Sequence, residues 1–182
     1  MRYFKTIKSI SLIISLFLIT SCSNNNAMKP EDFKNKEPRL IIEDYLTGDV
    51  KAWGVLQNRS GKVTRQFSAD LNGTWDGKQL ILKEKFNWDD GEIQNREWTI
   101  TKIDEHNYEG TAGDVIGKAI GYSYGPAFKF EYVLLVPVKG KNIKITFDDW
   151  IFKQDERVAI NRATMTKFGF KVAELTVVFV KD

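Results

Sequence analysis

The sequence predicts an all-β fold, an antiparallel up-and-down β-barrel of about ten strands. Three observations lead to this expectation. Apolar and polar residues alternate with period two from residue 49 onward, turn signals recur about every dozen residues, and no long helical pattern follows residue 48. The lack of helical periodicity argues against a parallel sheet with helical crossovers.

The composition is that of one compact domain, with 182 residues, 42% of them hydrophobic and 28% charged. Lys and Arg number 27 against 24 Asp and Glu, and three of the cations, Arg2, Lys5 and Lys8, lie in a leader that we expect to be removed. The rest of the chain then carries 24 charges of each sign, so a basic surface for nucleic acid is not expected.

Residues 1–21 are typical of a secretory signal peptide. The basic start precedes an apolar run from Ile10 to Ile19, which is shorter than the roughly 20 residues that span a bilayer. The leader ends Leu-Ile-Thr-Ser-Cys, which resembles a bacterial lipobox and implies cleavage before Cys22 and lipidation of its thiol. The alternative is an ordinary signal peptide that leaves an unpaired cysteine. Cys22 is the only cysteine, so no internal disulfide can form.

The residues after the lipidation site predict a tether. Ser23 favours sorting to the outer membrane, by resemblance to known lipoproteins, and several acyl chains make a durable anchor. Residues 22–44 are expected to form the lipidated cysteine and a polar linker, and Pro38–Leu46 is expected to form one short helix. The barrel domain is expected over residues 45–182.

Turn residues divide this domain into ten segments, because Gly, Asn and Asp supply the conformations that tight turns need. The predicted strands are 49–58, 63–75, 79–88, 93–103, 108–115, 117–124, 127–136, 142–153, 157–167 and 171–180. Alternation is clearest in 63–75, where Phe67, Ala69 and Leu71 share one face. Closing the meander removes its edge strands, which favours a lipocalin-like (calycin-like) barrel over the alternative, an open β-sandwich.

Residues 110–125 carry five glycines. They indicate either a bend at a barrel corner or a bare inner wall that leaves room for a ligand. We favour the bend, because Gly within strands usually marks one.

Signals for catalysis are weak. The single histidine, His106, lies at a predicted hairpin tip, a poor position for a general base. No Cys/His cluster has zinc spacing, and neither a metal nor another cofactor is expected. Asp148 and Asp149 lie within a strand and point to opposite faces, so they cannot form a catalytic pair on one wall.

Five charged residues share strand faces with apolar residues. They are Arg65, Glu84, Arg96, Asp149 and Arg162. Because an unpaired buried charge is costly, we predict that they meet in an internal polar network, with Trp150 and the other tryptophans lining it or filling the core. The network either fixes strand register or uses its surplus of positive charge to hold an acidic head group.

From Tyr45 to Lys181 the chain resembles a bacterial lipoprotein family, domain-of-unknown-function family 3833. The matching motifs are Gly48–Gly54, Asn58–Val63, Tyr108–Val115, Phe147–Trp150 and Asn161–Gly169. The resemblance implies an envelope lipoprotein without catalytic residues to carry over. Members are often encoded near enzymes that modify fatty acyl chains, which implies a connection to lipid. Within the motifs, the resemblance singles out seven residues, namely Asp114, Asp148, Asp149, Trp150, Asn161, Arg162 and Lys167.

These observations lead to three hypotheses of function. The first is a lipid-anchored barrel, on the periplasmic side of the outer membrane, that binds or shuttles an acidic amphipathic lipid such as a fatty acid or phospholipid, with Arg162 and Arg96 at its head group. The second is a structural or interaction module of the cell envelope with a filled barrel. The third is an enzyme acting on acyl or isoprenoid chains, with Asp148 or Asp149 as the acid–base group.

Overall fold

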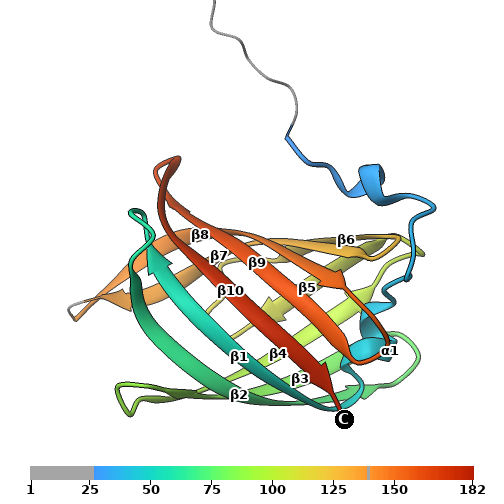
Figure 1. Ribbon diagram of the computed structural model, residues 1–182, viewed down its shortest axis with the longest axis horizontal. Helices are drawn as coiled ribbons and strands as arrows, with labels where there is room; N and C mark the ends of the chain where they lie inside the picture. Colours follow the sequence, from blue (N-terminus) through green and yellow to red (C-terminus); the bar gives the residue numbers. More distant parts are fainter. Residues whose placement is uncertain (1–26, 139) are drawn as a thin grey trace, which may run out of the picture.

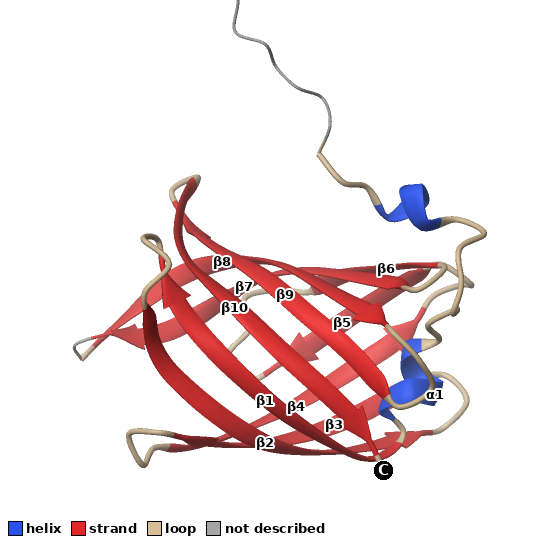
Figure 2. Ribbon diagram, in the orientation of Figure 1, coloured by secondary structure: helices blue, strands red, loops and turns tan. Residues whose placement is uncertain are grey.

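The computed structural model describes residues 27–138 and 140–182, which fold into a closed barrel of ten antiparallel strands (Figures 1 and 2). The predicted signal peptide and the lipidation of Cys22 lie outside the described residues. Every strand pairs with its neighbour in sequence, and β1 pairs with β10 to close the sheet. The up-and-down barrel is therefore confirmed, and the open sandwich is wrong.

The ten predicted strands are all present. They are β1 (Gly48–Asn58), β2 (Val63–Trp75), β3 (Gln79–Trp88), β4 (Ile93–Lys102), β5 (Asn107–Ala112), β6 (Ala119–Tyr124), β7 (Ala127–Val138), β8 (Lys141–Lys153), β9 (Val158–Lys167) and β10 (Phe170–Lys181). Buried and exposed residues alternate along β2 in the predicted phase, because only one side of the closed sheet faces the core.

One end of the barrel is closed by a plug, residues 40–46, which contains helix α1 (Ile42–Leu46) at the right of Figure 1. Leu40, Ile42 and Leu46 are at most 4% exposed. A Cβ on Gly73 of β2 would lie 1.9 Å from the Leu46 carbonyl oxygen, so this approach requires glycine. The helix is shorter than the predicted Pro38–Leu46 segment.

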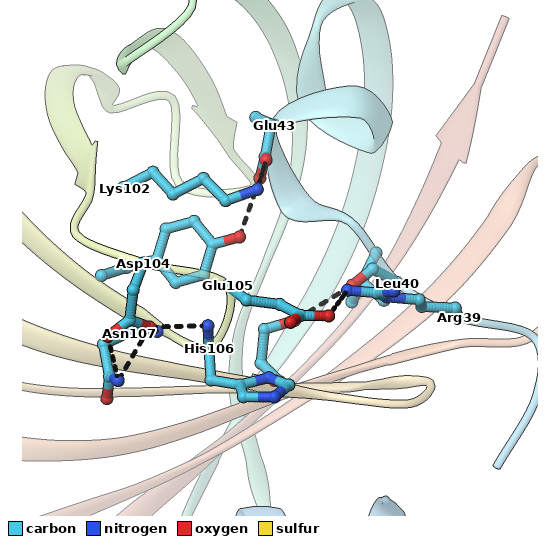
Figure 3. Close-up of polar contacts among 10 residues, drawn as sticks. Arg39, Leu40, Glu43, Lys102, Asp104, Glu105, His106 and Asn107 are labelled. Atoms are coloured by element: carbon cyan, nitrogen blue, oxygen red, sulfur yellow. Dashed lines mark hydrogen bonds and ion pairs between the residues drawn. The ribbon is translucent and has the colours of Figure 1, made fainter. Parts of the chain in front are cut away.

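The plug also carries a buried charge. Glu43 is 4% exposed, and it accepts hydrogen bonds from the Lys102 ammonium at 2.5 Å and from the Tyr108 hydroxyl at 3.0 Å. Figure 3 shows Glu43 and Lys102 facing each other below α1. This pair ties the plug to β4 and β5.

His106, also drawn in Figure 3, lies in the turn between β4 and β5 at the plug end. Its Nδ1 atom lies 2.8 Å from the Ser123 carbonyl oxygen, and its ring stacks on Tyr124 with centroids 4.1 Å apart. These contacts give the only histidine a structural place, away from the centre of the barrel.

The chain before the plug packs on the outside of the barrel. The short helix η1 (Pro30–Phe33) contacts β6 and β7, and the Phe33 ring lies 6.0 Å from Trp150 and 5.5 Å from Phe152, between ring centroids. The predicted linker is thus partly docked. Of the helices in the described chain, none is long and apolar enough to cross a membrane.

The glycine-rich stretch forms a loop, and aromatic rings pack against the glycines of the strands on either side of it. Residues 113–118 join two strands of only six residues each, β5 and β6. Cβ atoms on Gly110 and Gly121 would lie 2.4 Å from the Phe130 ring and 3.0 Å from the Phe128 ring. Aromatic rings therefore occupy the wall that the glycines leave bare, and the bend at residues 113–118 agrees with the favoured interpretation.

The other end of the barrel, which we call the mouth, is formed by the β1–β2, β3–β4, β7–β8 and β9–β10 turns at the left of Figure 1. Apolar side chains that point inward near this end are only half-buried. They are Phe86, Trp88, Val136, Ile143, Met165 and Leu175. These side chains therefore line the lumen beside the mouth.

Candidate functional site: a polar cluster in the barrel lumen

Six polar residues meet inside the barrel, and we call them the lumen cluster. They are Glu84, Arg96, Asp114, Tyr132, Asp149 and Asn161. The cluster lies between the plug and the apolar side chains of the mouth, in a lumen that is otherwise hydrophobic.

On one wall, Arg96 is held between two carboxylates. Glu84 on β3 is its direct cross-strand partner, with Arg96 Nη1 3.9 Å from Glu84 Oε2. Asp114, from the loop after β5, accepts hydrogen bonds at both carboxylate oxygens, from Arg96 Nε at 3.2 Å on Oδ1 and 3.1 Å on Oδ2, and from Nη2 at 2.8 Å on Oδ2. The forked pair with Asp114 is the stronger interaction, because it is short and bidentate.

On the opposite wall, Asp149 of β8 accepts hydrogen bonds from both neighbouring strands. The Tyr132 hydroxyl on β7 donates at 2.9 Å, and the Asn161 amide on β9 donates to the other carboxylate oxygen. Asn161 is 3% exposed and also donates to the Trp150 carbonyl oxygen at 3.2 Å. Asp149 is thus held by donors that favour its charged form.

The two walls interact across the lumen. Four strands separate β3 from β8 in either direction around the sheet. Even so, the two walls affect one another through their charges. Burial raises the pKa of Glu84 to about 7. The next largest effects on this pKa come from Arg96, whose charge lowers it, and from Asp149, whose charge raises it. Burial also raises the pKa of Asp149 to about 6, although its hydrogen bonds with Asn161 and Tyr132 oppose the rise.

One atom of the cluster lacks a close donor. Glu84 Oε2 is buried and lies 3.9 Å from Arg96 Nη1, and no residue in the described chain donates to this atom at hydrogen-bond distance, although the Trp98 side chain helps to lower the pKa of the Glu84 carboxyl group. The Glu84 side chain keeps 12% of its exposure and that of Arg96 keeps 15%, so both side chains retain a little contact with solvent. A buried carboxylate oxygen without a donor is costly, and a ligand with a donor group would satisfy it.

The structure brings together only part of the predicted network. Glu84, Arg96 and Asp149 meet as expected, with Asp114 and Asn161, which the family resemblance had singled out. Tyr132 was missed, because an inward tyrosine in an aromatic strand cannot be told from a core residue by alternation.

Three predicted members are elsewhere. Arg65 lies at the mouth, where it pairs with Asp90 and Glu92 of the β3–β4 turn at 2.7 and 2.8 Å and covers the Trp88 ring. Arg162 is on the outer face, 62% exposed at its side chain, and Trp150 is on the outer face under Phe33. Their inclusion in the network was wrong.

The other two motif residues also lie outside the lumen. Asp148 faces outward beside Lys129, at 3.6 Å, and Lys167 ends β9 at the mouth. The opposite directions of Asp148 and Asp149 confirm that they cannot act as a pair on one wall.

The charge balance of the lumen is the reverse of the prediction. With Arg65 paired at the mouth, Arg162 on the outer face and Asp114 inside, the one arginine of the lumen cluster faces three carboxyl groups. The expected surplus of positive charge does not exist, because it rested on the two arginines that lie elsewhere.

The molecule has two hollows. One, of about 550 Å³, crosses β2, β3 and β4, and its lining includes exposed side chains such as Asp70, Lys85 and Glu97 together with Leu71, Glu84 and Arg96. The other, of about 160 Å³, lies beside the plug near Arg39 and Lys153. Within residues 27–138 and 140–182, no group of His, Cys, Asp or Glu side chains is arranged to hold a metal ion.

The fold recurs in solved structures. The chain is similar to the S-type phycobiliprotein lyase CPES from Guillardia theta, with a TM-score of 0.58, 10% identity, and coverage of 77% of this chain and 90% of that one. It is also similar to a protein of unknown function from the DUF3598 family of Nostoc punctiforme, with a TM-score of 0.60, 15% identity, and coverage of 81% and 51%. These similarities identify a lipocalin-like, calycin-type barrel.

A comparison with curated proteins finds no match. The family described as protein of unknown function (DUF3833) matches residues 16–181, which include all ten strands and the lumen cluster. The chain therefore belongs to the DUF3833 family.

Proposed function

We propose that this protein binds an amphipathic, lipid-like molecule in its barrel, with the apolar chain at the mouth and the head group at the lumen cluster. The unpartnered Glu84 Oε2 atom is the observation on which the proposal rests. Lipid-binding sites are mostly apolar with a few convergent polar groups, and this lumen has that composition.

The head group that fits best is neutral or cationic and donates hydrogen bonds, such as a hydroxyl, an amide or an amine. Arg96 is already engaged by Asp114, so an anionic head group would have to displace that carboxylate and would then face Glu84 and Asp149. A donor can instead bind Glu84 Oε2 directly. The fatty-acid carboxylate expected from the sequence is therefore the less favoured head group.

The first experiment compares three probes of equal chain length: monoolein, oleylamine and oleate. We expect monoolein or oleylamine to raise the melting temperature at neutral pH more than oleate does. Native mass spectrometry of protein extracted from membranes should show the corresponding class of bound lipid. A protein that carries no lipid and responds to none of the probes would instead favour a filled barrel that acts as a structural or interaction module.

The second experiment removes the acceptor. Glu84→Leu should weaken binding of the donor probe by about ten- to a hundredfold, the value of a hydrogen bond to a charged group. Glu97→Leu is the matched control, because Glu97 lies on the outer face of the next strand. Equal binding by both variants would refute a head group at Glu84.

A second candidate function follows from the raised pKa values of Glu84 and Asp149, to about 7 and about 6, since a general acid or base works best when its pKa is near the working pH. In that case the barrel would chemically change a bound acyl or isoprenoid chain. Mass spectrometry of lipid recovered after incubation distinguishes the two functions: a carrier returns the lipid unchanged, whereas an enzyme returns a product that Asp149→Asn abolishes.

We also propose that Cys22 carries the lipid anchor and that the barrel faces the periplasm from the outer membrane. The lipobox-like sequence that ends at Cys22 supports this. Radiolabelled palmitate should enter the wild-type protein and not the Cys22→Ser variant, and membrane fractionation should recover the label in the outer membrane. Label that remains in the Cys22→Ser variant would refute the assignment.

A further inference from the structure

The β9–β10 hairpin ends in two exposed aromatic side chains between two lysines, in the sequence Lys167-Phe168-Gly169-Phe170-Lys171. Phe168 is 88% exposed and Phe170 is 76% exposed. In Figure 1 this hairpin is the dark-red loop that projects from the mouth, at the end of the barrel opposite α1. Phenylalanines this exposed add nothing to the hydrophobic core.

Phe168 is also an unfavourable residue for this turn. Lys167 and Phe170 pair, which leaves Phe168 and Gly169 as a two-residue loop with φ values of 51° and 78°. Asn-Gly is the preferred sequence for such a loop, because bulky side chains are strained at positive φ. Both the backbone conformation and the exposure of position 168 therefore disfavour phenylalanine. Residues that are unfavourable in this way often lie at functional sites.

The neighbouring turns repeat this combination of apolar tips and cations. At the β1–β2 turn, Val63 is 44% exposed beside Arg59 and Lys62, and at the β7–β8 turn Val138 is 41% exposed beside Lys141. Exposed apolar side chains at these strand ends thus have basic residues near them in the chain.

We propose that this edge of the mouth is a bilayer-docking surface, which inserts Phe168 and Phe170 into the interface of a membrane containing anionic lipids. Aromatic tips that bury in the interface while lysines contact lipid phosphates are the combination by which peripheral proteins bind such membranes. The charge is complementary, because Lys167 and Lys171 flank the tip and the nearest acid, Glu174, is paired with Lys171 at 3.0 Å.

The β3–β4 turn gives the surface a direction. It carries Asp89, Asp90 and Glu92, of which only Asp90 and Glu92 are paired, both with Arg65. This acidic turn belongs on the side of the mouth that stays away from an anionic bilayer. The barrel then meets the membrane obliquely through its β9–β10 and β1–β2 turns.

This contact is separate from the proposed lipid anchor and from the proposed ligand. The chain before the plug packs against Trp150 and Phe152, near the plug end of β8, whereas Phe168 lies at the mouth. Docking therefore needs neither acylated Cys22 nor a bound lipid.

The test uses residues 23–182, which contain every strand, both helices and the whole core of the closed barrel and cannot carry the anchor. Cosedimentation is measured with vesicles of phosphatidylcholine alone and with vesicles that contain one third phosphatidylglycerol. We expect binding to the anionic vesicles, reduced about a hundredfold by the double change Phe168→Asn and Phe170→Ser. Changing Lys167 and Lys171 to Gln should reduce it about fivefold for each lysine.

Two controls separate docking from folding. Asn is favoured at the conformation of residue 168, so the double variant should melt no lower than the wild type. Trp53→Ser removes another exposed aromatic, 51% exposed on the outer face of β1, and should leave vesicle binding unchanged. Absence of wild-type binding to anionic vesicles, retention of it in the double variant, or self-association that depends on Phe168 and Phe170 would each overturn the proposal.

Discussion

The charge state of Glu84 makes the stability of the barrel depend on pH. Its ordinary pKa is 4.5, and burial raises the pKa to about 7 in the folded protein. Between these values the folded protein holds a proton that the unfolded chain has released, so the free energy of unfolding falls as the pH rises. The loss is about 1.4 kcal/mol per pH unit, or about 3 kcal/mol in all.

Glu84→Gln keeps the shape of the side chain and removes the titration. Arg96 retains its forked pair with Asp114 in the variant, so no cation is left unpaired. We expect the variant and the wild type to be equally stable near pH 4.5, and the variant to be more stable by about 3 kcal/mol near pH 8. Asp149 titrates in both proteins, so the difference between them reports on Glu84 and on its coupling to Asp149.

The measurement is urea denaturation followed by tryptophan fluorescence at several pH values across this range. Trp98, 5% exposed within the core, reports on unfolding. Glu97→Gln, on the exposed outer face, is the control and should differ from the wild type by a constant amount. A difference between Glu84→Gln and the wild type that does not grow with pH, or a variant that is less stable at alkaline pH, would refute the burial of an ionisable Glu84.

Two further predictions concern the plug. Gly73→Ala should lower the free energy of unfolding by about 2 kcal/mol or more, because the new Cβ collides with the Leu46 carbonyl. Gly113→Ala is the control, because its Cβ meets open space and stability should change little. Thermal denaturation compares the two variants, and equal melting temperatures would contradict the packing of the plug on Gly73. Lys102→Met should lower the free energy of unfolding by about 2 kcal/mol, because the buried Glu43 carboxylate then keeps only the Tyr108 hydroxyl as a donor. Denaturant unfolding measures this loss, and an unchanged midpoint would show that the ion pair contributes nothing to stability.

The lumen and the docking surface support one another without depending on one another. The apolar side chains of the mouth lead inward to Glu84, and the docking surface would hold that mouth against a bilayer. An amphiphile could then pass between membrane and barrel with little exposure of its chain to water. Vesicle binding by Glu84→Leu and ligand binding by the Phe168 variant test the two separately.

The faces of β9 show why alternation alone misplaced part of the site. Val158, Ile160 and Arg162 occupy one face, and Ala159, Asn161 and Ala163 the other. The first face is the more hydrophobic, yet the second faces the lumen, with Ala159 and Ala163 at most 2% exposed. Small side chains face inward there because aromatic rings from other strands fill the space, which a single strand cannot reveal.

The family motifs compensate for only part of this error, because they also singled out Arg162 and Trp150, which lie on the outer face. They singled out Asp114 and Asn161, which alternation had not placed in the network and which prove to bind Arg96 and Asp149. They also singled out Asp148 and Lys167, which lie outside the lumen. A motif therefore marks a region of interest, whereas the direction of each side chain needs the closed sheet.

The sequence by itself determined the ten strands, their turns and their antiparallel order, because alternation and turn chemistry act between residues that are close in the chain. The tertiary structure alone decided that Asp114 and Tyr132 join Arg96 and Asp149 in the lumen, that Arg162 lies outside, and that residues 40–46 close one end. These depend on the closure of the sheet, which brings strands half a circumference apart into contact and sets which of two similar faces is buried.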